Sequence, residues 1–347
     1  MSRGPRPRPF ELRDEIERQR DLRLRYRYLD LRRPSMHEPI VLRSKIMQII
    51  RNYFCENHFT EIRDAHPHQV HARGRARLSR SPAVCSRATS TRCPRARSST
   101  SRFLMLSGFD RYFQLAHCYR DEDLRADRQP EFTQVDEEMS FVSEDDIMTL
   151  NEGLIKRLWK EMLNVDVETP FYRMPWDEAM GRFGSDKPDT RFGLEIQDVT
   201  EVFRGTEFKP FAAVLEAGGT IRAINAKGLA DKLSRKTSQA RRGRQAYGAK
   251  GLAYVTVAED GTLGGPVAKN ITDAERAGLA QAAGAEPGDC IFFAAGPVNS
   301  SRALLGAARL EIGKRCGLIN DDEWSFVWVV DRPLVQALRR GPCRWRR

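Results

Sequence analysis

The sequence predicts an α+β protein in which an antiparallel sheet with flanking helices is interrupted by a smaller α+β module. In the first half, predicted strands follow one another or are joined by a polar loop, without the strand–helix–strand alternation of a doubly wound sheet. From about residue 195, short strands alternate with glycine-containing turns. With 347 residues, 40% of them hydrophobic, the chain is long enough for two folded units.

Helical and strand periodicities place the elements of the first half. Ser35-Met-His-Glu38 matches a capping box and precedes apolar residues at helical spacing, so a long amphipathic helix is expected to start there. A second helix is expected after Ser143-Glu-Asp-Asp146. The strands expected between these helices are Phe59–Arg63, Arg111–Cys118 and Glu131–Val142.

The second half is expected to form a separate module before the chain returns to the first domain. Its turns include Ala-Gly-Gly-Thr and Glu-Asp-Gly-Thr. The expected strands are Phe211–Ala217, Thr220–Asn225, Gly251–Val257, Cys290–Ala295 and Trp324–Val330, and the expected helices are Thr272–Ala283 and Ser300–Cys316.

The net charge of +11 is concentrated in two segments. Segment 64–102 carries nine arginines against the single acid Asp64, and the tail from Arg332 adds six arginines; the remainder is mildly acidic. Segment 64–102 has no Phe, Tyr or Trp and no helical or strand periodicity. It is typical of a disordered Arg/Ser-rich insert, of a basic arm that contacts RNA, or of a shifted reading frame. The interrupted core on either side favours the shifted frame.

Several classes of protein are disfavoured by composition. The seven cysteines are scattered without a C-x-x-C pair, which predicts reduced thiols and no metal site. The sequence has no apolar run of about 18 residues, so no membrane span is predicted. The start, MSRGPRPRPFELRDE, lacks the apolar stretch of a secretory signal, so the cytoplasm is the expected location.

A dense polar stretch between two predicted strands is the strongest candidate for chemistry. It runs from Arg120 to Gln129 and is followed by PEFTQVDEEMSF. Arg120 and Glu122 are two residues apart, so at a strand end they share one face. On the return strand, a polar row shares a face: Phe132, Gln134, Asp136, Glu138 and Ser140. Such a row is commonly solvent-exposed, but an arginine and a carboxylate at its mouth can make it the floor of a pocket.

Four blocks of sequence, in order, resemble the catalytic half of a bacterial-type aspartyl-tRNA synthetase. GFDRYFQLAHCYRDEDLRADRQPEFTQVDEEMSF resembles motif 2 of the class II aminoacyl-tRNA synthetases, and YRYLDLRRP with the following helix resembles the lead into motif 1. GRFGSDKPDTRF and FKPFAAVLEAGGTIRAINAKG resemble the bacterial aspartyl-type insertion domain. The resemblance implies a catalytic domain over 1–194, an insertion domain over 195–308 and a return to the catalytic domain over 309–347.

The resemblance implies ATP-dependent activation of L-aspartate to aspartyl-adenylate, followed by transfer to tRNA, with Mg²⁺ held mainly between phosphates and a homodimer formed through motif 1. The catalytic arginine of motif 2 falls on Arg120, whose planar cation suits both a carboxylate and the α-phosphate. Glu122 and Gln129 fall on ATP-side positions, and Asp136 falls on the position that receives the substrate ammonium.

The sequence also departs from the family pattern. The aspartate-contacting glutamate and the Gln/Lys-containing loop expected within 64–102 have no counterpart there, nor has the proline that ends motif 1. The anticodon-binding barrel, the substrate-binding histidine, the late ATP-site acid and motif 3 are also expected to lie outside this sequence. Impaired or absent activity is therefore expected. The alternatives are a non-catalytic RNA-binding fragment and a sibling ligase for asparagine or lysine, and the inserted module with GSDKPD argues against the sibling.

Overall fold

The computed structural model describes the chain in two compact units, Met1–Pro170 and Phe171–Arg347. The described residues are Phe10, Leu12, Asp14, 20–63, 79–83, 86–93, 103–119, Gln129, 131–230, 252–336 and 344–345. Each unit has its own hydrophobic core.

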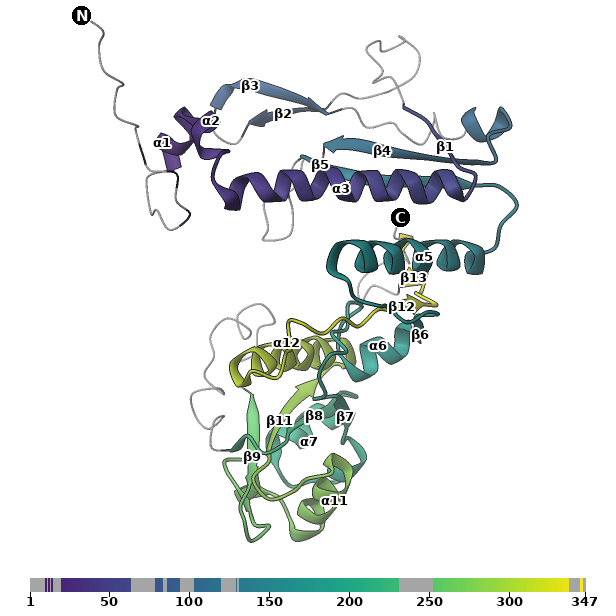
Figure 1. Cartoon of the computed structure of the whole chain (residues 1–347). Helices are drawn as coiled ribbons and strands as arrows, with labels where there is room; N and C mark the ends of the chain where they lie inside the picture. The colour runs from purple at the N-terminus through teal and green to yellow at the C-terminus, as the bar shows by residue number, and fades with distance from the viewer. Residues whose placement is uncertain are drawn as a thin grey trace, which may run out of the picture. The chain divides into compact units, whose positions relative to one another are not determined.

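The first unit contains a three-stranded sheet in the order β1-β4-β5, with β1 parallel to β4 and β4 antiparallel to β5. The helices α3 and α5 pack against this sheet and against each other (Figure 1). The elements are α1 (Arg20–Arg25), α2 (Arg27–Asp30), α3 (Pro34–Glu56), β1 (Thr60–Glu61), β2 (Ser79–Ala83), β3 (Ser86–Cys93), β4 (Arg111–Tyr119), β5 (Glu131–Met139) and α5 (Glu144–Leu163).

The core of the first unit is aromatic. Phe54 of α3 stacks on Phe113 of β4, with ring centroids 4.8 Å apart, and meets Phe59 edge-on at 5.0 Å. Leu154 brings α5 into the same cluster. The apolar spacing that predicts the two helices therefore also defines the faces that bury them.

The start of α5 follows the sequence prediction. The Ser143 hydroxyl accepts a hydrogen bond from the Asp146 amide at 3.4 Å, and the Asp146 carboxylate accepts one from the Ser143 amide at 2.8 Å. This reciprocal pair is a capping box. Just before it, β5 ends at Met139, three residues earlier than the expected end at Val142. The left-handed backbone of Phe141, with a φ of 56°, does not continue a strand.

The predicted capping box at Ser35 is wrong. The helix begins one residue earlier, at Pro34, and the residue before it provides no side-chain cap. Proline is favoured in this first position because its fixed φ suits a helix and its missing N–H needs no partner. Ser35 instead donates its amide hydrogen to the carboxylate of Asp14, at 3.2 Å.

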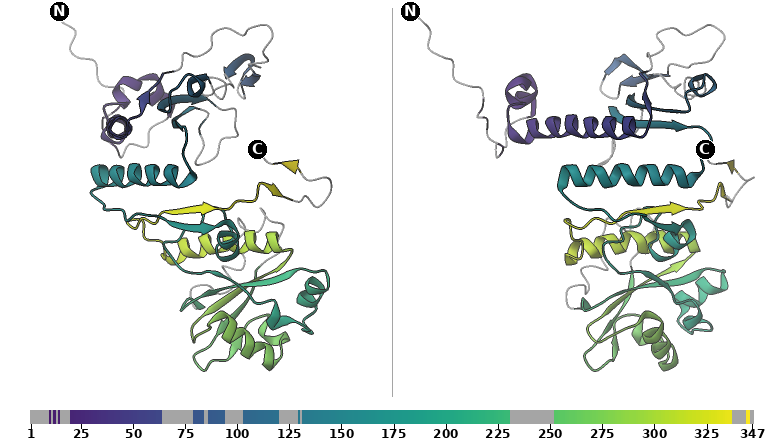
Figure 2. Two further views of the ribbon diagram at one scale, coloured as in Figure 1. Left: turned by 90° about the vertical axis from the view of Figure 1, so that its right-hand side faces the viewer. Right: turned by 45° about the vertical axis from the view of Figure 1, so that its right-hand side comes forward.

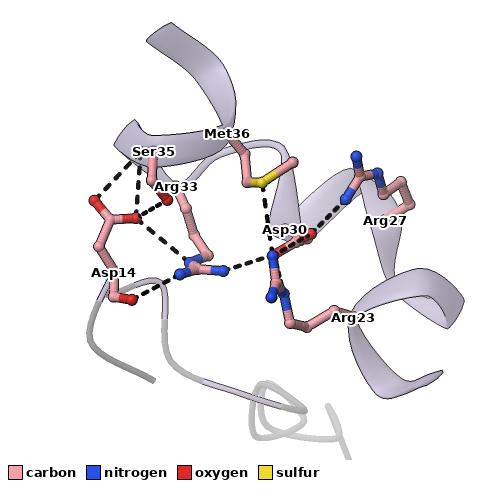
Figure 3. A network of polar contacts seen from close by, with 7 residues as sticks. All are labelled: Asp14, Arg23, Arg27, Asp30, Arg33, Ser35 and Met36. Carbon is pink, nitrogen blue, oxygen red and sulfur yellow. Dashed lines mark hydrogen bonds and ion pairs between the residues drawn. The ribbon is translucent and has the colours of Figure 1, made fainter. Parts of the chain in front are cut away.

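The segment that leads into α3 is held by a buried carboxylate (Figure 3). Asp30 has no solvent-exposed surface and pairs with Arg23 at 2.9 Å, Arg27 at 2.6 Å and Arg33 at 3.0 Å. The Arg33 guanidinium also donates to the Asp14 carbonyl at 2.8 Å. A buried carboxylate requires such partners, and here they tie α1, α2 and the start of α3 together.

Segment 64–102 contains two strands where the sequence predicts no periodicity. The backbones of β2 and β3 pair antiparallel, with an irregularity between Pro82 and Ala83. Of the three interpretations of this segment, the pairing disagrees with a wholly disordered insert at these residues. Backbone pairing does not require an apolar face, and β3 contains two threonines, Thr89 and Thr91, which favour strands. The rest of the segment lies outside the described residues.

The second unit is built on a five-stranded antiparallel sheet in the order β10-β9-β11-β8-β7. Beside it, β6 pairs in parallel with β12. The elements are β6 (Tyr172–Pro175), α6 (Trp176–Arg182), β7 (Ile196–Asp198), η1 (Glu201–Phe203), α7 (Lys209–Glu216), β8 (Thr220–Ala226), β9 (Ala253–Val257), β10 (Leu263–Gly264), η2 (Ala268–Asn270), α11 (Asp273–Ala283), β11 (Cys290–Gly296), α12 (Val298–Cys316), β12 (Val327–Val330), β13 (Val335–Gln336) and β14 (Arg344–Trp345).

Helices cover both faces of the five-stranded sheet (Figure 2). On one face, Ile221 of β8 and Phe293 of β11 belong to a buried cluster with α7 and α11. On the other face, Ile224 of β8 packs with Leu305 of α12. Because side chains alternate along a strand, β8 and β11 bury apolar residues on both faces of the sheet.

One predicted strand of this unit is wrong. Residues expected as the strand Phe211–Ala217 form the helix α7 instead. The segment KPFAAVLE contains alanine, leucine and glutamate, which favour helices, and a proline in the first turn, which starts one. Both predicted helices of the unit are confirmed. Thr272 caps α11 through a capping box, and α12 begins at Val298, two residues before the expected Ser300.

Candidate active-site sheet

The candidate site lies on the antiparallel pair β4–β5. Nine residues of each strand are paired, from Arg111 opposite Met139 to Tyr119 opposite Glu131. The polar stretch singled out in the sequence therefore connects two adjacent strands at one end of the sheet. In this stretch the structure describes Gln129, which is exposed. Arg120 and Glu122 lie outside the described residues.

One face of the β4–β5 pair packs into the hydrophobic core of the first unit. Phe113 and Leu115 of β4 and Val135 and Met139 of β5 contact the cluster formed with α3 and α5. Because the side-chain period of a strand is two residues, the intervening residues must lie on the opposite face. Burial of the apolar side chains on one face therefore fixes which polar side chains lie on the other.

The opposite face carries half-buried polar side chains. Asp136 lies directly across from Gln114, and Gln134 lies across from Ala116. The Gln134 amide donates a hydrogen bond to the Asp136 carboxylate at 3.5 Å, and the Cys118 thiol approaches the Gln134 carbonyl at 3.8 Å. A carboxylate oriented by neighbouring amides can accept hydrogen bonds from a substrate ammonium.

The structure adds Gln114 to the residues singled out from the sequence. Alternation along RYFQLAHC already places Gln114 on the face opposite Phe113, so the signal was present in the strand pattern. The register across the strands, which places it beside Asp136, comes from the structure. Ser140, by contrast, lies beyond the end of β5, and its amide donates to the Asp110 carbonyl at 2.9 Å.

Glu137 is the unusual residue of the sheet, because it lies on the face that carries the core. Asn151 of α5 donates a hydrogen bond to its Oε1 at 2.5 Å, whereas its Oε2 is buried and has no hydrogen-bond partner among the described residues. Burial raises the pKa of Glu137 above its ordinary value, and the negative charge of Asp136 adds to the effect, whereas the Asn151 hydrogen bond opposes it.

The GRFGSDKPDTRF segment of the second unit is organised by a buried arginine. Arg309 of α12 is 1% exposed and donates hydrogen bonds to the carbonyls of Asp189, Phe192 and Gly193, at 2.8, 2.5 and 2.8 Å. Its guanidinium also lies 3.9 Å from the ring centroid of Phe192 and 4.8 Å from that of Phe183. Burial lowers the pKa of Arg309 to about 10.

Close packing of this segment on α12 requires two glycines. A Cβ added at Gly184, whose φ is +67°, would lie 2.1 Å from the Arg302 carbonyl oxygen. A Cβ added at Gly306 would lie 2.7 Å from the Phe183 carbonyl oxygen. Because neither position leaves room for a side chain, the contact between this segment and α12 requires glycine at both.

The described residues contain no group of three or more His, Cys, Asp or Glu side chains placed to hold a metal ion. In the same part of the chain, no helix combines the length and apolar character that a membrane crossing requires.

Comparison with known proteins assigns the class. Residues 19–340 match the model of the family described as tRNA synthetases class II (D, K and N). The chain belongs to this family. The antiparallel β4–β5 pair and the mixed helices and sheets agree with the α+β fold expected from the sequence.

Within this family, the curated relatives that the chain resembles are named aspartate–tRNA ligases. The chain is 48% identical over 332 residues to the aspartate–tRNA(Asp/Asn) ligase of Saccharopolyspora erythraea, covering 96% of this chain and 54% of the relative. It is 46% identical to the enzyme of the same name from Arthrobacter sp., covering 95% of this chain and 54% of the relative. It is 44% identical to the aspartate–tRNA ligase of Agathobacter rectalis, covering 94% and 55%. The chain thus spans about half the length of the curated relatives it matches.

Proposed function

We propose that the chain is the catalytic part of an aspartate–tRNA ligase, which activates L-aspartate with ATP to aspartyl-adenylate and transfers aspartate to tRNA. Membership of the class II family and the names of the relatives support the reaction. The observation that carries the choice of site is the polar face of β4–β5, where Asp136 is half-buried beside Gln114 and Gln134.

The proposed roles follow from charge and position. Asp136 would pair with the α-ammonium of aspartate. Arg120 directly follows the last residue of β4 and would bridge the substrate carboxylate and the α-phosphate, because a guanidinium presents two parallel donors. Its charge would also stabilise the transition state of the in-line displacement. Glu122 and Gln129 would contact ATP.

Magnesium is proposed as a partner of ATP rather than of a protein cluster. The class II family uses ATP, and Mg²⁺ in such sites is held by few protein groups and by phosphate oxygens. When bound, Mg²⁺ would neutralise phosphate charge. The residues of this chain would orient the two substrates.

A homodimer is proposed through α3. The helix buries Ile50 and Phe54 in the core but exposes three consecutive apolar residues nearer its start, Ile40, Val41 and Leu42. An exposed apolar stretch on a helix is suited to a second copy of the same surface. We also propose a cytoplasmic location and tRNA as the macromolecular partner, both from the class of the relatives.

The domain limits remain a proposal: a catalytic domain over 1–194 and 309–347, and an insertion over 195–308. The five-stranded sheet supports the insertion, because its strands run from Ile196 of β7 to Gly296 of β11, within those limits.

The test is aspartate-dependent exchange of pyrophosphate into ATP, without tRNA. The chain as written is expected to exchange at least about a hundredfold more slowly than an intact relative, because one lost preorganised contact typically costs about 10²–10³ in rate. The family positions expected within 64–102 have no counterpart there. Exchange within tenfold of the relative would contradict the expected impairment.

The substrate is tested in a version of the chain whose reading frame is restored between codons 63 and 102. Exchange should then require L-aspartate, and asparagine or lysine should not replace it. In this version Arg120→Ala should abolish exchange and Arg120→Lys should not restore it, whereas the control Arg128→Ala should retain it. No aspartate-dependent exchange in the restored chain would refute the proposed reaction.

A further inference from the structure

Arg222 of β8 is a buried cation with too few partners. It is 7% exposed, and its Nη2 lies 2.9 Å from Oδ2 of Asp198. Its Nε is buried and has no hydrogen-bond acceptor among the described residues. More than about 90% of buried polar groups in proteins have a partner, so an unpaired donor on a buried charged group requires an explanation.

A second arginine lies on α12, the helix that packs against the face of β8 carrying Arg222. Arg302 of α12 also has a buried Nε without an acceptor in the described part of the chain. Burial chiefly lowers the pKa of Arg222; the charge of Asp198 opposes this, and the charge of Arg302 adds to it. Asp198 is 47% exposed, and these three side chains together carry one excess positive charge.

The start of a long helix adds to the positive potential. The 19-residue α12 begins at Val298, and no side chain caps its N-terminus. The hydroxyls of Thr220 and Ser301 lie 3.3 Å apart, which places the first turn of α12 beside β8. Thr220 and Arg222 are two residues apart and therefore share this face of the strand, toward α12. An uncapped helix N-terminus favours anions because its amide hydrogens point outward.

We propose that Arg222, Arg302 and the first turn of α12 form a binding site for a small oxyanion of the phosphate class, apart from the β4–β5 sheet. Phosphate carries only acceptor oxygens at its charged face, which match guanidinium and backbone amide donors. It also offsets the excess positive charge, which a bound water cannot do. The buried setting suits a free ion or a terminal phosphate rather than the backbone of an RNA duplex.

The experiment is calorimetric titration of the full chain with inorganic phosphate, against sodium chloride at equal ionic strength. Arg302→Gln should weaken phosphate binding at least tenfold, and Arg222→Gln should do the same where it folds. The matched control is Arg315→Gln on the same helix, because Arg315 is exposed and pairs with Glu311 at 2.7 Å. It should bind phosphate like the parent chain.

Two results would overturn the site. One is the absence of phosphate binding beyond the chloride control. The other is binding that Arg302→Gln leaves unchanged. Phosphate could also enter the proposed nucleotide site, so Arg120→Ala is included and should leave the measured affinity unchanged. Loss of binding in Arg120→Ala, with retention in Arg302→Gln, would assign the ion to the nucleotide site and refute the proposal. None of these outcomes depends on aspartate-dependent exchange.

Discussion

Removing the guanidinium of Arg309 is expected to destabilise the second unit by about 4 kcal/mol. In Arg309→Ala, the carbonyls of Asp189, Phe192 and Gly193 lose their donor, and each unsatisfied buried acceptor costs about 1–3 kcal/mol. The lost contacts with Phe183 and Phe192 add up to about 2 kcal/mol. These contributions span about 3–11 kcal/mol, and removing a buried charge offsets part of them, which leaves a net loss of about 4 kcal/mol, in the lower part of that range.

Thermal unfolding followed by circular dichroism measures this effect. For a unit of this size, about 4 kcal/mol corresponds to a midpoint lowered by about 8–16 °C. Arg309→Met, which keeps much of the volume, separates the lost hydrogen bonds from a cavity and should remain well below the parent. The control Arg315→Ala, on the same helix, removes an exposed ion pair with Glu311 and should cost less than about 1 kcal/mol. Equal midpoints for Arg309→Ala and Arg315→Ala would refute the assigned role.

Three further predictions concern the first unit. Ser143→Ala should lower stability by about 1 kcal/mol, because it removes one arm of the capping box with Asp146; chemical denaturation with an unchanged slope would show it. The hydrogen bond from Arg23, above all, lowers the pKa of Asp30, so the stability it contributes is present above the unfolded pKa of about 4 and is lost as the pH falls through the folded pKa. Asp30→Asn should therefore be less stable than the parent at neutral pH, and its free energy of unfolding should fall less steeply in acid. An unchanged fall in acid would contradict this role of Asp30. Burial raises the pKa of Glu137, so the stability it contributes is present below its unfolded pKa and is lost as the pH rises through the folded pKa. Glu137→Gln can still accept the hydrogen bond from Asn151, so its free energy of unfolding should exceed that of the parent at pH 8 and equal it near pH 4. A variant less stable than the parent at pH 8 would contradict this account.

Much of the secondary structure could be predicted from local pattern. The β4 and β5 strands follow from alternation, and α5 follows from its capping box and apolar spacing. The errors lie where local signals compete. At Ser35 a capping-box pattern was overridden by a neighbouring proline that starts the helix, and from Lys209 to Glu216 helix-favouring residues form a helix where apolar content predicted a strand.

The candidate site could be predicted only in part. Alternation places Asp136 and Gln134 on one face, because a strand with one buried face fixes the other. The pairing of Asp136 with Gln114 requires the register between two strands separated by a long polar loop, and only the structure supplies it. The positions of Arg120 and Glu122 lie outside the described residues, so their grouping with Asp136 stays a prediction.

By itself the sequence determined the class II resemblance, the α+β character and the amphipathic faces of the main helices. These depend on residue order and on periods of 2 and 3.6, which are local properties. Only the tertiary structure decided that Asp30 is buried among arginines, that Arg309 holds the segment around Phe192 and that Arg222 is buried beside Asp198. A charged residue looks solvated in sequence, because the partners that make its burial possible come from elements that fold back from elsewhere in the chain.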